Sequence, residues 1–219
     1  MTQAEALNIL KTGANVFLTG EPGSGKTHTV NSFVAYLREH GIEPAITAST
    51  GIAATHIGGS TLHSWSGIGI KKFLSEYDLD AIASSEYVAP RLFKAKILII
   101  DEVSMLGKNT LDMVDAVCRE VRHDPRPFGG LQVVCVGDFF QLPPVVKGEE
   151  ASGFAFESDA WQRLGGIVCY LSEQHRQDDA AFLSVLSAIR KRNIEKPHLE
   201  LLQNRTDDHH DLPKEITQL

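Results

Sequence analysis

The sequence predicts an α/β fold in which a parallel β-sheet carries helices on both faces. Short apolar runs alternate with helical patterns along the chain, and the runs are apolar at nearly every position. Near-continuous apolar strands separated by helices are typical of a parallel sheet that is covered on both faces. No internal repeat or low-complexity segment interrupts the alternation. The predicted strands lie at residues 16–18, 45–47, 97–100, 133–136 and 167–171.

Helical periodicity is clearest in two segments, where apolar residues recur at spacings of three to four. This spacing predicts a helix with one buried face. The two sets are Leu111, Val114, Cys118 and Val121, and Phe182, Val185, Leu186 and Ile189. The second set ends at the basic cluster Arg190–Arg192. Positive charge suits a helix C-terminus, where the helix dipole is negative.

Composition and charge bound the class of protein. The 219 residues are 42% hydrophobic and 22% charged, which is typical of a globular chain with one substantial core. The net charge of −7 is unlike that of most nucleic-acid binders, although a local groove could still bind DNA. No apolar run approaches the roughly 20 residues that span a bilayer. Residues 1–10 carry no basic residue and lack a secretory pattern, so we expect a cytoplasmic (nucleoid-associated) or nuclear protein without membrane contact.

The three cysteines, Cys118, Cys135 and Cys169, are odd in number and show no C-x-x-C spacing. Two of them lie in apolar, strand-like runs. We expect three free thiols in a reducing compartment, acting mostly as small core residues.

The sharpest motif is residues 20–27, GEPGSGKT, which matches G-x-x-x-x-G-K-[ST] between a strand and a helix. Its glycines allow a tight turn that aims backbone N–H groups at phosphate oxygens. Lys26 is expected to reach the β- and γ-phosphates, and the Thr27 hydroxyl to hold Mg²⁺. The cofactors expected are therefore ATP and Mg²⁺. The predicted nucleotide-binding residues of this loop are Gly20, Gly23, Ser24, Gly25, Lys26, Thr27 and His28.

Two acidic residues end the third predicted strand. Asp101 is expected to hold Mg²⁺ at the carboxyl edge of the sheet, directly or through water. Glu102 is then placed to polarise the attacking water. Alternatively, the two acids could simply end the strand without a chemical role. The complete phosphate-binding loop earlier in the chain disfavours this alternative.

The run GDFFQLPP at residues 137–144 also follows a predicted strand. Gln141 could sense the γ-phosphate or its water, whereas Phe139, Phe140 and the two prolines form a stiff apolar ridge. On chemistry alone, a γ-phosphate-sensing role for this segment and a hydrophobic loop packed on the core are equally supported.

Five stretches together resemble the Pif-type (petite-integration-frequency) helicases of superfamily one, which are five-prime to three-prime DNA motors. Residues 111–130 are similar to the signature region of that family. The resemblance covers roughly residues 3–193 and implies a RecA-like P-loop NTPase domain that couples ATP hydrolysis to movement on single-stranded DNA and duplex unwinding. The five stretches are residues 20–27, 47–54, 57–69, 98–105 and 137–145.

The resemblance also implies roles for residues that chemistry alone would leave unassigned. Gln3 matches the glutamine that reads adenine, and Arg176 matches the arginine that contacts the γ-phosphate. Without the resemblance, both would be taken for surface polar or ion-paired residues, and His63 for a packed histidine. The residues expected to contact single-stranded DNA are Thr50, Gly51, His63 and Ser64, with Phe139 available for stacking.

The resemblance ends before the second motor domain of the family. Residues 1–193 are expected to form the motor domain, and residues 194–219 a polar tail that leads toward the absent second domain. We therefore expect a monomeric piece of a longer protein that binds nucleotide, binds single-stranded DNA weakly and does not unwind duplexes. Residues 207–211 (DDHHD) could ligate a metal, but a solvated loop is favoured because consecutive side chains point in different directions.

Two other functional classes remain open. A GTPase or small-molecule kinase would also carry the phosphate-binding loop, although a guanine-reading N-K-x-D run is absent. A non-catalytic adaptor that only binds nucleotide is disfavoured by the intact pair Asp101 and Glu102.

Overall fold

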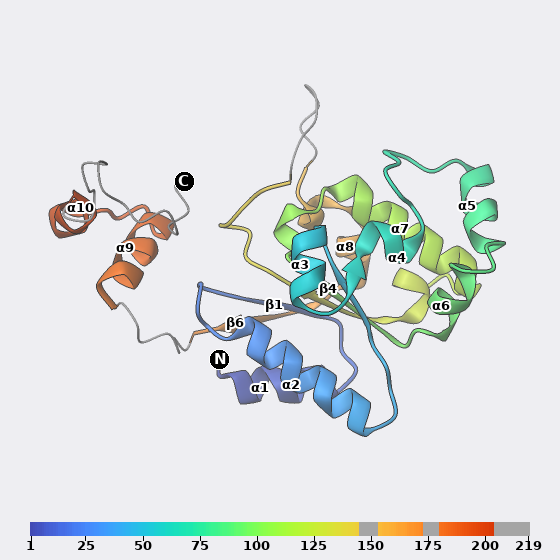
Figure 1. Cartoon of the computed structure of the whole chain (residues 1–219), viewed down its shortest axis with the longest axis horizontal. Helices are drawn as coiled ribbons and strands as arrows, with labels where there is room; N and C mark the ends of the chain where they lie inside the picture. Colours follow the sequence, from blue (N-terminus) through green and yellow to red (C-terminus); the bar gives the residue numbers. More distant parts are fainter. Residues whose placement is uncertain (145–152, 173–179, 204–219) are drawn as a thin grey trace, which may run out of the picture. The chain divides into compact units, whose positions relative to one another are not determined.

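The computed structural model describes residues 1–144, 153–172 and 180–203 (Figure 1). The chain divides into two compact units, Met1–His175 and Arg176–Leu219. Among the described residues, no helix combines the length and apolar character needed to cross a membrane.

The first unit is built on a six-stranded sheet in which every neighbouring pair is parallel. The strand order is β3-β2-β4-β5-β1-β6. The predicted parallel α/β fold is therefore confirmed, and all five predicted strands are present. The strands are β1 (Val16–Gly20), β2 (Ala45–Ala48), β3 (Ser60–Thr61), β4 (Ile97–Asp101), β5 (Gln132–Val136) and β6 (Ile167–Leu171).

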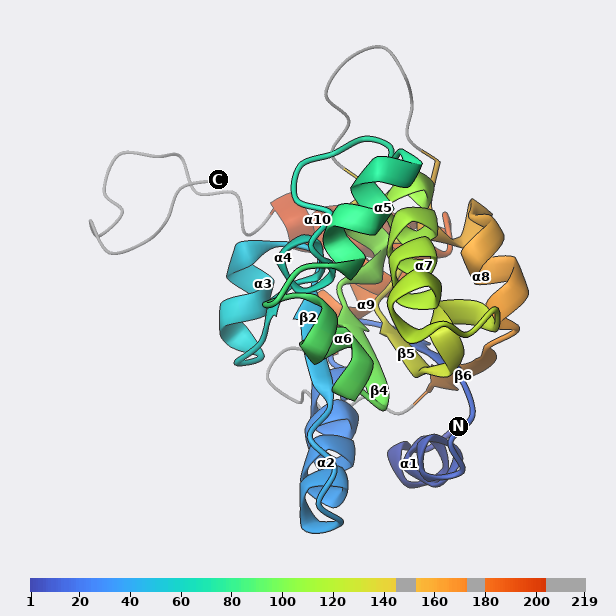
Figure 2. The same ribbon diagram turned by 90° about the vertical axis from the view of Figure 1, so that its right-hand side faces the viewer.

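Helices cover both faces of this sheet (Figures 1 and 2). On one face lie α1 (Gln3–Lys11) and α2 (Lys26–Glu39). The other face carries most of the remaining helices of this unit. The helices after α2 are α3 (Gly51–His56), α4 (Leu62–Ser66), α5 (Glu76–Ala83), α6 (Ala89–Lys94), α7 (Lys108–Arg122) and α8 (Asp159–Leu164), with short 3₁₀ turns η1 (Val103–Met105), η2 (Pro127–Gly130) and η3 (Ala155–Glu157).

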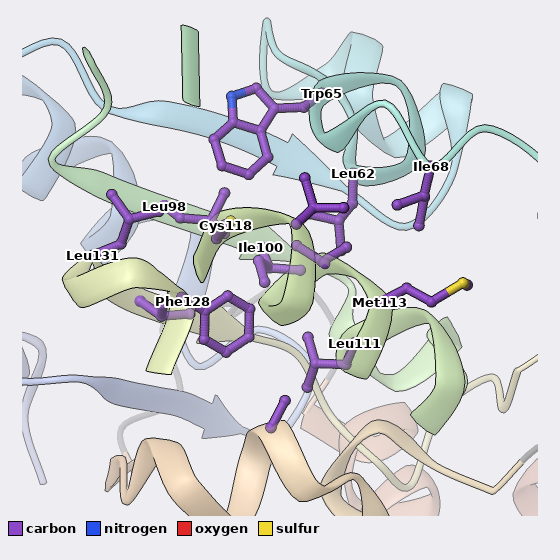
Figure 3. Close-up of a cluster of buried hydrophobic side chains, with 14 of the residues drawn as sticks. Leu62, Trp65, Ile68, Leu98, Ile100, Leu111, Met113, Cys118, Phe128 and Leu131 are labelled. Atoms are coloured by element: carbon purple, nitrogen blue, oxygen red, sulfur yellow. The ribbon is translucent and has the colours of Figure 1, made fainter. Parts of the chain in front are cut away.

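Each face of the sheet has its own hydrophobic core. Under α1 and α2, the buried cluster includes Leu10, Leu18 and Phe33. The larger cluster on the opposite face joins α4, α7, η2 and β4 through side chains such as Leu62 and Phe128 (Figure 3). Because both faces of the central strands are buried, those strands are apolar at nearly every position.

The three cysteines are free and buried, as the sequence predicts. Burial raises the pKa of the Cys135 thiol to about 12 and also raises that of Cys118. A thiol that stays protonated is a poor nucleophile, so these two cysteines act as small core residues.

Helix α7 buries the face that its periodicity predicts. That face also carries Asp115, whose side chain is completely buried. Its Oδ1 accepts a hydrogen bond from the Phe128 N–H at 2.7 Å, and its Oδ2 accepts from Arg119 Nε at 2.8 Å and Arg163 Nη2 at 2.7 Å. This single carboxylate therefore ties α7 to η2 and α8.

The described part of the second unit contains α9 (Ala180–Arg190) and α10 (Lys196–Gln203), which contact each other. Helix α9 confirms that the second periodic segment is helical; Val185 is buried as predicted, whereas Ile189 is exposed and does not belong to a buried face. Helix α10 falls inside the segment 194–219 that the sequence predicts to be a polar tail, and none of its described residues is buried; that this tail leads toward a second motor domain stays a prediction. The two units divide after His175, whereas the sequence placed the end of the motor domain at residue 193. The run at 207–211 lies outside the described residues.

Replacing Asp115 with Ala should lower the free energy of unfolding by about 2–4 kcal/mol. Removing one member of a buried ion pair commonly costs about 3–5 kcal/mol, and the partial exposure of both arginines reduces that value. Chemical denaturation would measure the change. Asp124→Ala is the control, because it breaks an ion pair with the exposed Arg126 and should cost much less. Equal losses in the two variants would contradict a structural role for Asp115.

Candidate functional site

The predicted site residues converge on the carboxyl edge of the sheet. Strands β1, β2, β4 and β5 all run in the same direction, so the segments that follow them emerge together. The Ser49 N–H, directly after β2, donates to the Asp101 carbonyl at 3.2 Å, which joins two of these segments. In open parallel sheets, this edge is where ligands bind.

The loop between β1 and α2 presents an open helix N-terminus. Helix α2 begins at Lys26, and its N-cap Gly25 is left-handed (φ 88°) and supplies no side-chain cap. The first N–H groups of a helix lack partners within the helix, and the helix dipole makes this end positive. The loop therefore offers a ready site for an anion such as a phosphate.

Two glycines of this loop are required, Gly20 by close contacts and Gly25 by its left-handed backbone (φ 88°). A Cβ at Gly20 would lie 2.6 Å from Ser24 Oγ and 2.7 Å from the Leu171 carbonyl oxygen. At Gly25, a Cβ would overlap the Gln3 side-chain nitrogen. Ser24 Oγ is buried and has no hydrogen-bond partner among the described residues. A bound ligand could supply the missing hydrogen bond.

Lys26 is folded toward its own loop. Its Nζ donates to the Gly20 carbonyl at 2.9 Å and to the Glu21 carbonyl at 3.3 Å. The ammonium therefore lies over the turn that a phosphate would enter, where it can exchange carbonyl partners for phosphate oxygens.

Helix α1 brings Gln3 to the same loop. The Gln3 Nε2 donates a long hydrogen bond of 3.4 Å to the Ser24 carbonyl. Beside it lies a cavity of about 280 Å³ between α1 and α2. Its lining residues are Gln3, Ala4, Leu7, His28, Thr29 and Ser32. Gln3 and His28, which are 25 positions apart in the sequence, thus share one cavity that could hold a planar base.

The acidic pair lies at the end of β4. Asp101 Oδ1 accepts a hydrogen bond from the Glu102 N–H at 2.9 Å. Burial raises the pKa of both carboxyls, and the Asp101 charge raises that of Glu102 further, while Lys26 lowers both. Glu102 also adopts a left-handed backbone (φ 51°), which is uncommon outside glycine and costs about 1–3 kcal/mol. Strained and poorly solvated acids of this kind are typical of functional sites.

The residues also fit a magnesium ion. No group of three or more His, Cys, Asp or Glu side chains that could hold a metal is found in the described part of the chain. Mg²⁺ commonly uses only one or two protein oxygens and takes the others from phosphates and water. The Thr27 hydroxyl and Asp101 can supply those two oxygens.

The segment after β5 contains a buried acid that sequence reasoning missed. Asp138 is 1% exposed, and its carboxylate accepts from the Phe140 N–H at 3.1 Å and from Gln141 Nε2 at 3.4 Å. The Gln141 N–H donates to the Asp138 carbonyl at 2.9 Å, so the loop forms a tight turn. Asp138 also raises the pKa of Glu102. The signal in the sequence was an acid directly after an apolar strand, as at Asp101.

The two adjacent phenylalanines differ in environment. The Phe139 ring is half-buried in an aromatic cluster, with centroids at 4.8 Å from Phe156, 5.3 Å from Phe17 and 5.8 Å from Trp161. The prediction that Phe139 stacks on a nucleotide base does not fit this packing. Phe140, in contrast, is 74% exposed.

The predicted DNA-contact residues lie after β2 and β3. Thr50 caps α3, since its side chain accepts from the Ala53 N–H at 3.2 Å, and Gly51 is the first residue of that helix. On α4, Ser64 is exposed and His63 is half-buried. Burial lowers the pKa of His63, which favours the neutral ring in the chain without DNA. Arg176, the predicted γ-phosphate contact, lies outside the described residues.

The family model for PIF1-like helicases matches residues 2–198. The chain belongs to the PIF1-like helicase family. The resemblance found in five sequence stretches is therefore confirmed.

Individual relatives cover nearly the whole chain. The ATP-dependent DNA helicase Pif1 of Psychrobacter sp. (strain PRwf-1) is 50% identical over 93% of this chain. The crystal structure of Pif1 helicase from Candida albicans matches 98% of it with a TM-score of 0.88 and 36% identity. Pif1 from Bacteroides in complex with ADP-AlF3 and ssDNA matches 97% with a TM-score of 0.82 and 36% identity. The chain spans 32% of the first relative's length and 49% and 51% of the two crystallised chains.

Glu102→Gln should raise the thermal midpoint of the nucleotide-free chain at pH 7.5 by about 1–3 °C. The expected rise is small because Glu102 is partly exposed and solvent screens its charge. Below the ordinary pKa of 4.5 the carboxyl is protonated in both states. As the pH rises from 4.5 toward the raised pKa of the folded state, the unfolded chain loses this proton first, so the fold loses stability, and the loss is complete above the raised pKa. The gain should therefore vanish near pH 4. Thermal unfolding at both pH values measures it, with the exposed Glu86→Gln as the control. An unchanged or lower midpoint at pH 7.5 would contradict the unfavourable burial.

Proposed function

We propose that this chain is the nucleotide-binding motor domain of an ATP-dependent DNA helicase. The observation that carries the proposal is the convergence of an open helix N-terminus, Lys26 and the pair Asp101 and Glu102 on one edge of the sheet. Two named relatives support it, since one is called an ATP-dependent DNA helicase and the other was crystallised with ADP-AlF3 and ssDNA.

Nucleotide binding would use groups that are already in place. The β- and γ-phosphates would lie on the N–H groups of the loop and α2, with Lys26 moving from the Gly20 carbonyl to a phosphate oxygen. Adenine would enter the cavity beside Gln3, whose amide can donate to and accept from a base edge. Mg²⁺, held by Thr27 and Asp101, would offset phosphate charge.

Hydrolysis would depend on Glu102. Its raised pKa makes it a stronger base than an ordinary carboxylate, which favours removal of a proton from the attacking water. Gln141, fixed by Asp138 in the neighbouring turn, is placed to orient that water or contact the γ-phosphate. The predicted role of Arg176 in contacting the γ-phosphate remains part of the proposal.

Single-stranded DNA would bind along the loops after β2 and β3. Thr50 and Gly51 begin α3, and His63 and Ser64 lie on the outer side of α4, so small groups and N–H donors are available to phosphates. Stacking is assigned to Phe140 rather than Phe139 because Phe140 is the exposed ring. We expect weak binding and no unwinding by these 219 residues alone, since two-domain closure and an arginine finger would come from the family's second motor domain.

Lys26→Ala should weaken ADP and ATP binding by about 10–100-fold, because it removes a charge-assisted contact worth about 1.5–3 kcal/mol. Calorimetric titration with Mg²⁺ present measures the affinity. Glu102→Gln is the matched control: it should bind nucleotide while the rate of ATP hydrolysis falls about 10²–10⁴-fold. Equal nucleotide affinity in wild type and Lys26→Ala would remove Lys26 from the site.

Phe140→Ala should weaken binding of a labelled oligonucleotide by about 5–100-fold, since each stacked base contributes about 1–3 kcal/mol. Phe139→Ala should instead lower thermal stability, because its ring packs against Phe17, Phe156 and Trp161. Fluorescence anisotropy at two salt concentrations, with a thermal melt of each variant, separates the two effects. If Phe139→Ala loses DNA affinity with an unchanged melt, the assignment of the two rings is reversed.

A further inference from the structure

Helix α4, which carries two of the proposed DNA contacts, is only five residues long. So short a helix has almost no internal hydrogen bonds and is marginal without outside support. Its inner side is anchored by the buried residues Leu62, Trp65 and Ser66. At its N-terminus, the Thr61 hydroxyl accepts from the Ser64 N–H at 3.1 Å.

The C-terminus of α4 is held by a cation from another helix. Arg91, on α6, donates from Nε to the Trp65 carbonyl at 2.8 Å and from Nη2 to the Ser64 carbonyl. These carbonyls form the negative end of the helix, where a positive charge is stabilising. The planar fork of a guanidinium can contact both oxygens at once, which a lysine ammonium cannot match.

Helix α6 is itself fixed in place. Its Leu92 side chain is fully buried in the same core as Leu62 (0% exposed each). Arg122, on α7, donates from Nη1 to the carbonyls of Leu92 and Ala95 at 3.0 and 2.8 Å. A guanidinium on so constrained a helix can define the position of α4.

The junction between the two helices is also tight. Gly67, the left-handed C-cap of α4, would place a Cβ only 3.0 Å from Val88, the N-cap of α6. The junction therefore leaves little room for a side chain at position 67, and the C-terminus of α4 lies close to the N-terminus of α6.

We propose that Arg91 is a positioning residue for DNA binding, which holds α4 so that His63 and Ser64 face the strand. The inference rests on the proposed DNA contacts of these two residues. Arg91 acts through the α4 carbonyls, and so its effect should differ from that of a basic residue that attracts DNA by charge alone.

Lys94 provides the matched control. It lies on the same helix and lines the same cavity as Arg91, about 410 Å³ in volume, so Lys94→Ala removes the same charge from nearly the same place. A general loss of attraction to the polyanion would affect both variants equally.

The experiment compares Arg91→Ala, Arg91→Lys and Lys94→Ala in the 219-residue chain. Oligo(dT) affinity is measured by anisotropy, and hydrogen exchange is measured on the peptide that spans residues 62–69. Arg91→Ala should weaken binding about five- to tenfold and speed exchange of that peptide, because two charge-assisted hydrogen bonds are lost. Arg91→Lys should recover part of both effects, Lys94→Ala should change neither by more than about twofold, and nucleotide affinity should stay at the wild-type value throughout.

Equal DNA affinity in Arg91→Ala and Lys94→Ala would overturn the inference, as would unchanged exchange of residues 62–69. His63→Ala and Ser64→Ala, measured in parallel, separate this failure from a failure of the proposed DNA site. If both leave DNA affinity unchanged, the proposed contacts on α4 are wrong, and a loss in Arg91→Ala would then mean direct contact with DNA. If they weaken binding while Arg91→Ala does not, only the positioning role fails.

Discussion

Two half-buried carboxylates beside one lysine at the carboxyl edge of the sheet are the constraint on which the site depends. Burial opposes the ionisation of Asp101 and Glu102 by raising the pKa of each, and the charges of Asp101 and Asp138 raise the pKa of Glu102 further. Lys26 offsets only part of this, while its Nζ also contacts the Gly20 and Glu21 carbonyls. The nucleotide-free edge is therefore electrostatically unfavourable, and a bound cation with phosphates would relieve it.

The side chains around the phosphate-binding loop are positioned by close packing rather than by many polar contacts. The absence of side chains at Gly20 and Gly25 lets β6 and Gln3 approach the phosphate-binding loop. On the opposite face, arginine side chains donate hydrogen bonds to the carbonyls at helix C-termini. Arg122 donates to carbonyls at the end of α6, and Arg91 to carbonyls at the end of α4. Asp115 supplies the complementary negative charge within α7. The arginine contacts that hold α4 and α6 therefore lie on the face opposite α1 and α2, the helices that flank the phosphate-binding loop.

The sequence predicted much of the fold because the strands that matter most are buried on both faces. Such strands are nearly continuous apolar runs, and all five appear at their predicted positions. Strand β3 was missed because it is two residues long and polar, Ser60–Thr61, so that neither length nor alternation marks it. Helix α10 was missed because its segment is polar, and none of its described residues is buried.

The sequence predicted the site residues that belong to local motifs. The phosphate-binding loop and the acids after β4 carry their signals in adjacent residues, whereas the cavity shared by Gln3 and His28 arises only when α1 packs on α2. The choice between Phe139 and Phe140 could not be made because a loop has no period that indicates which ring points inward. Asp138 did carry a local signal, an acid directly after an apolar strand, whereas Arg91 contacts a helix that lies 26 positions earlier, which spacing along the chain does not encode.

The central claim is that this edge of the sheet is a nucleotide site whose acidic pair requires a divalent cation. Thermal unfolding of the chain with ADP and Mg²⁺, added separately and together, tests it most directly. Ligand at about 100 times its dissociation constant adds about 2.7 kcal/mol of stability. The account predicts a clear rise in midpoint with both together, a smaller rise with ADP alone and little change with Mg²⁺ alone. A midpoint that does not respond to Mg²⁺ and ADP together would contradict it.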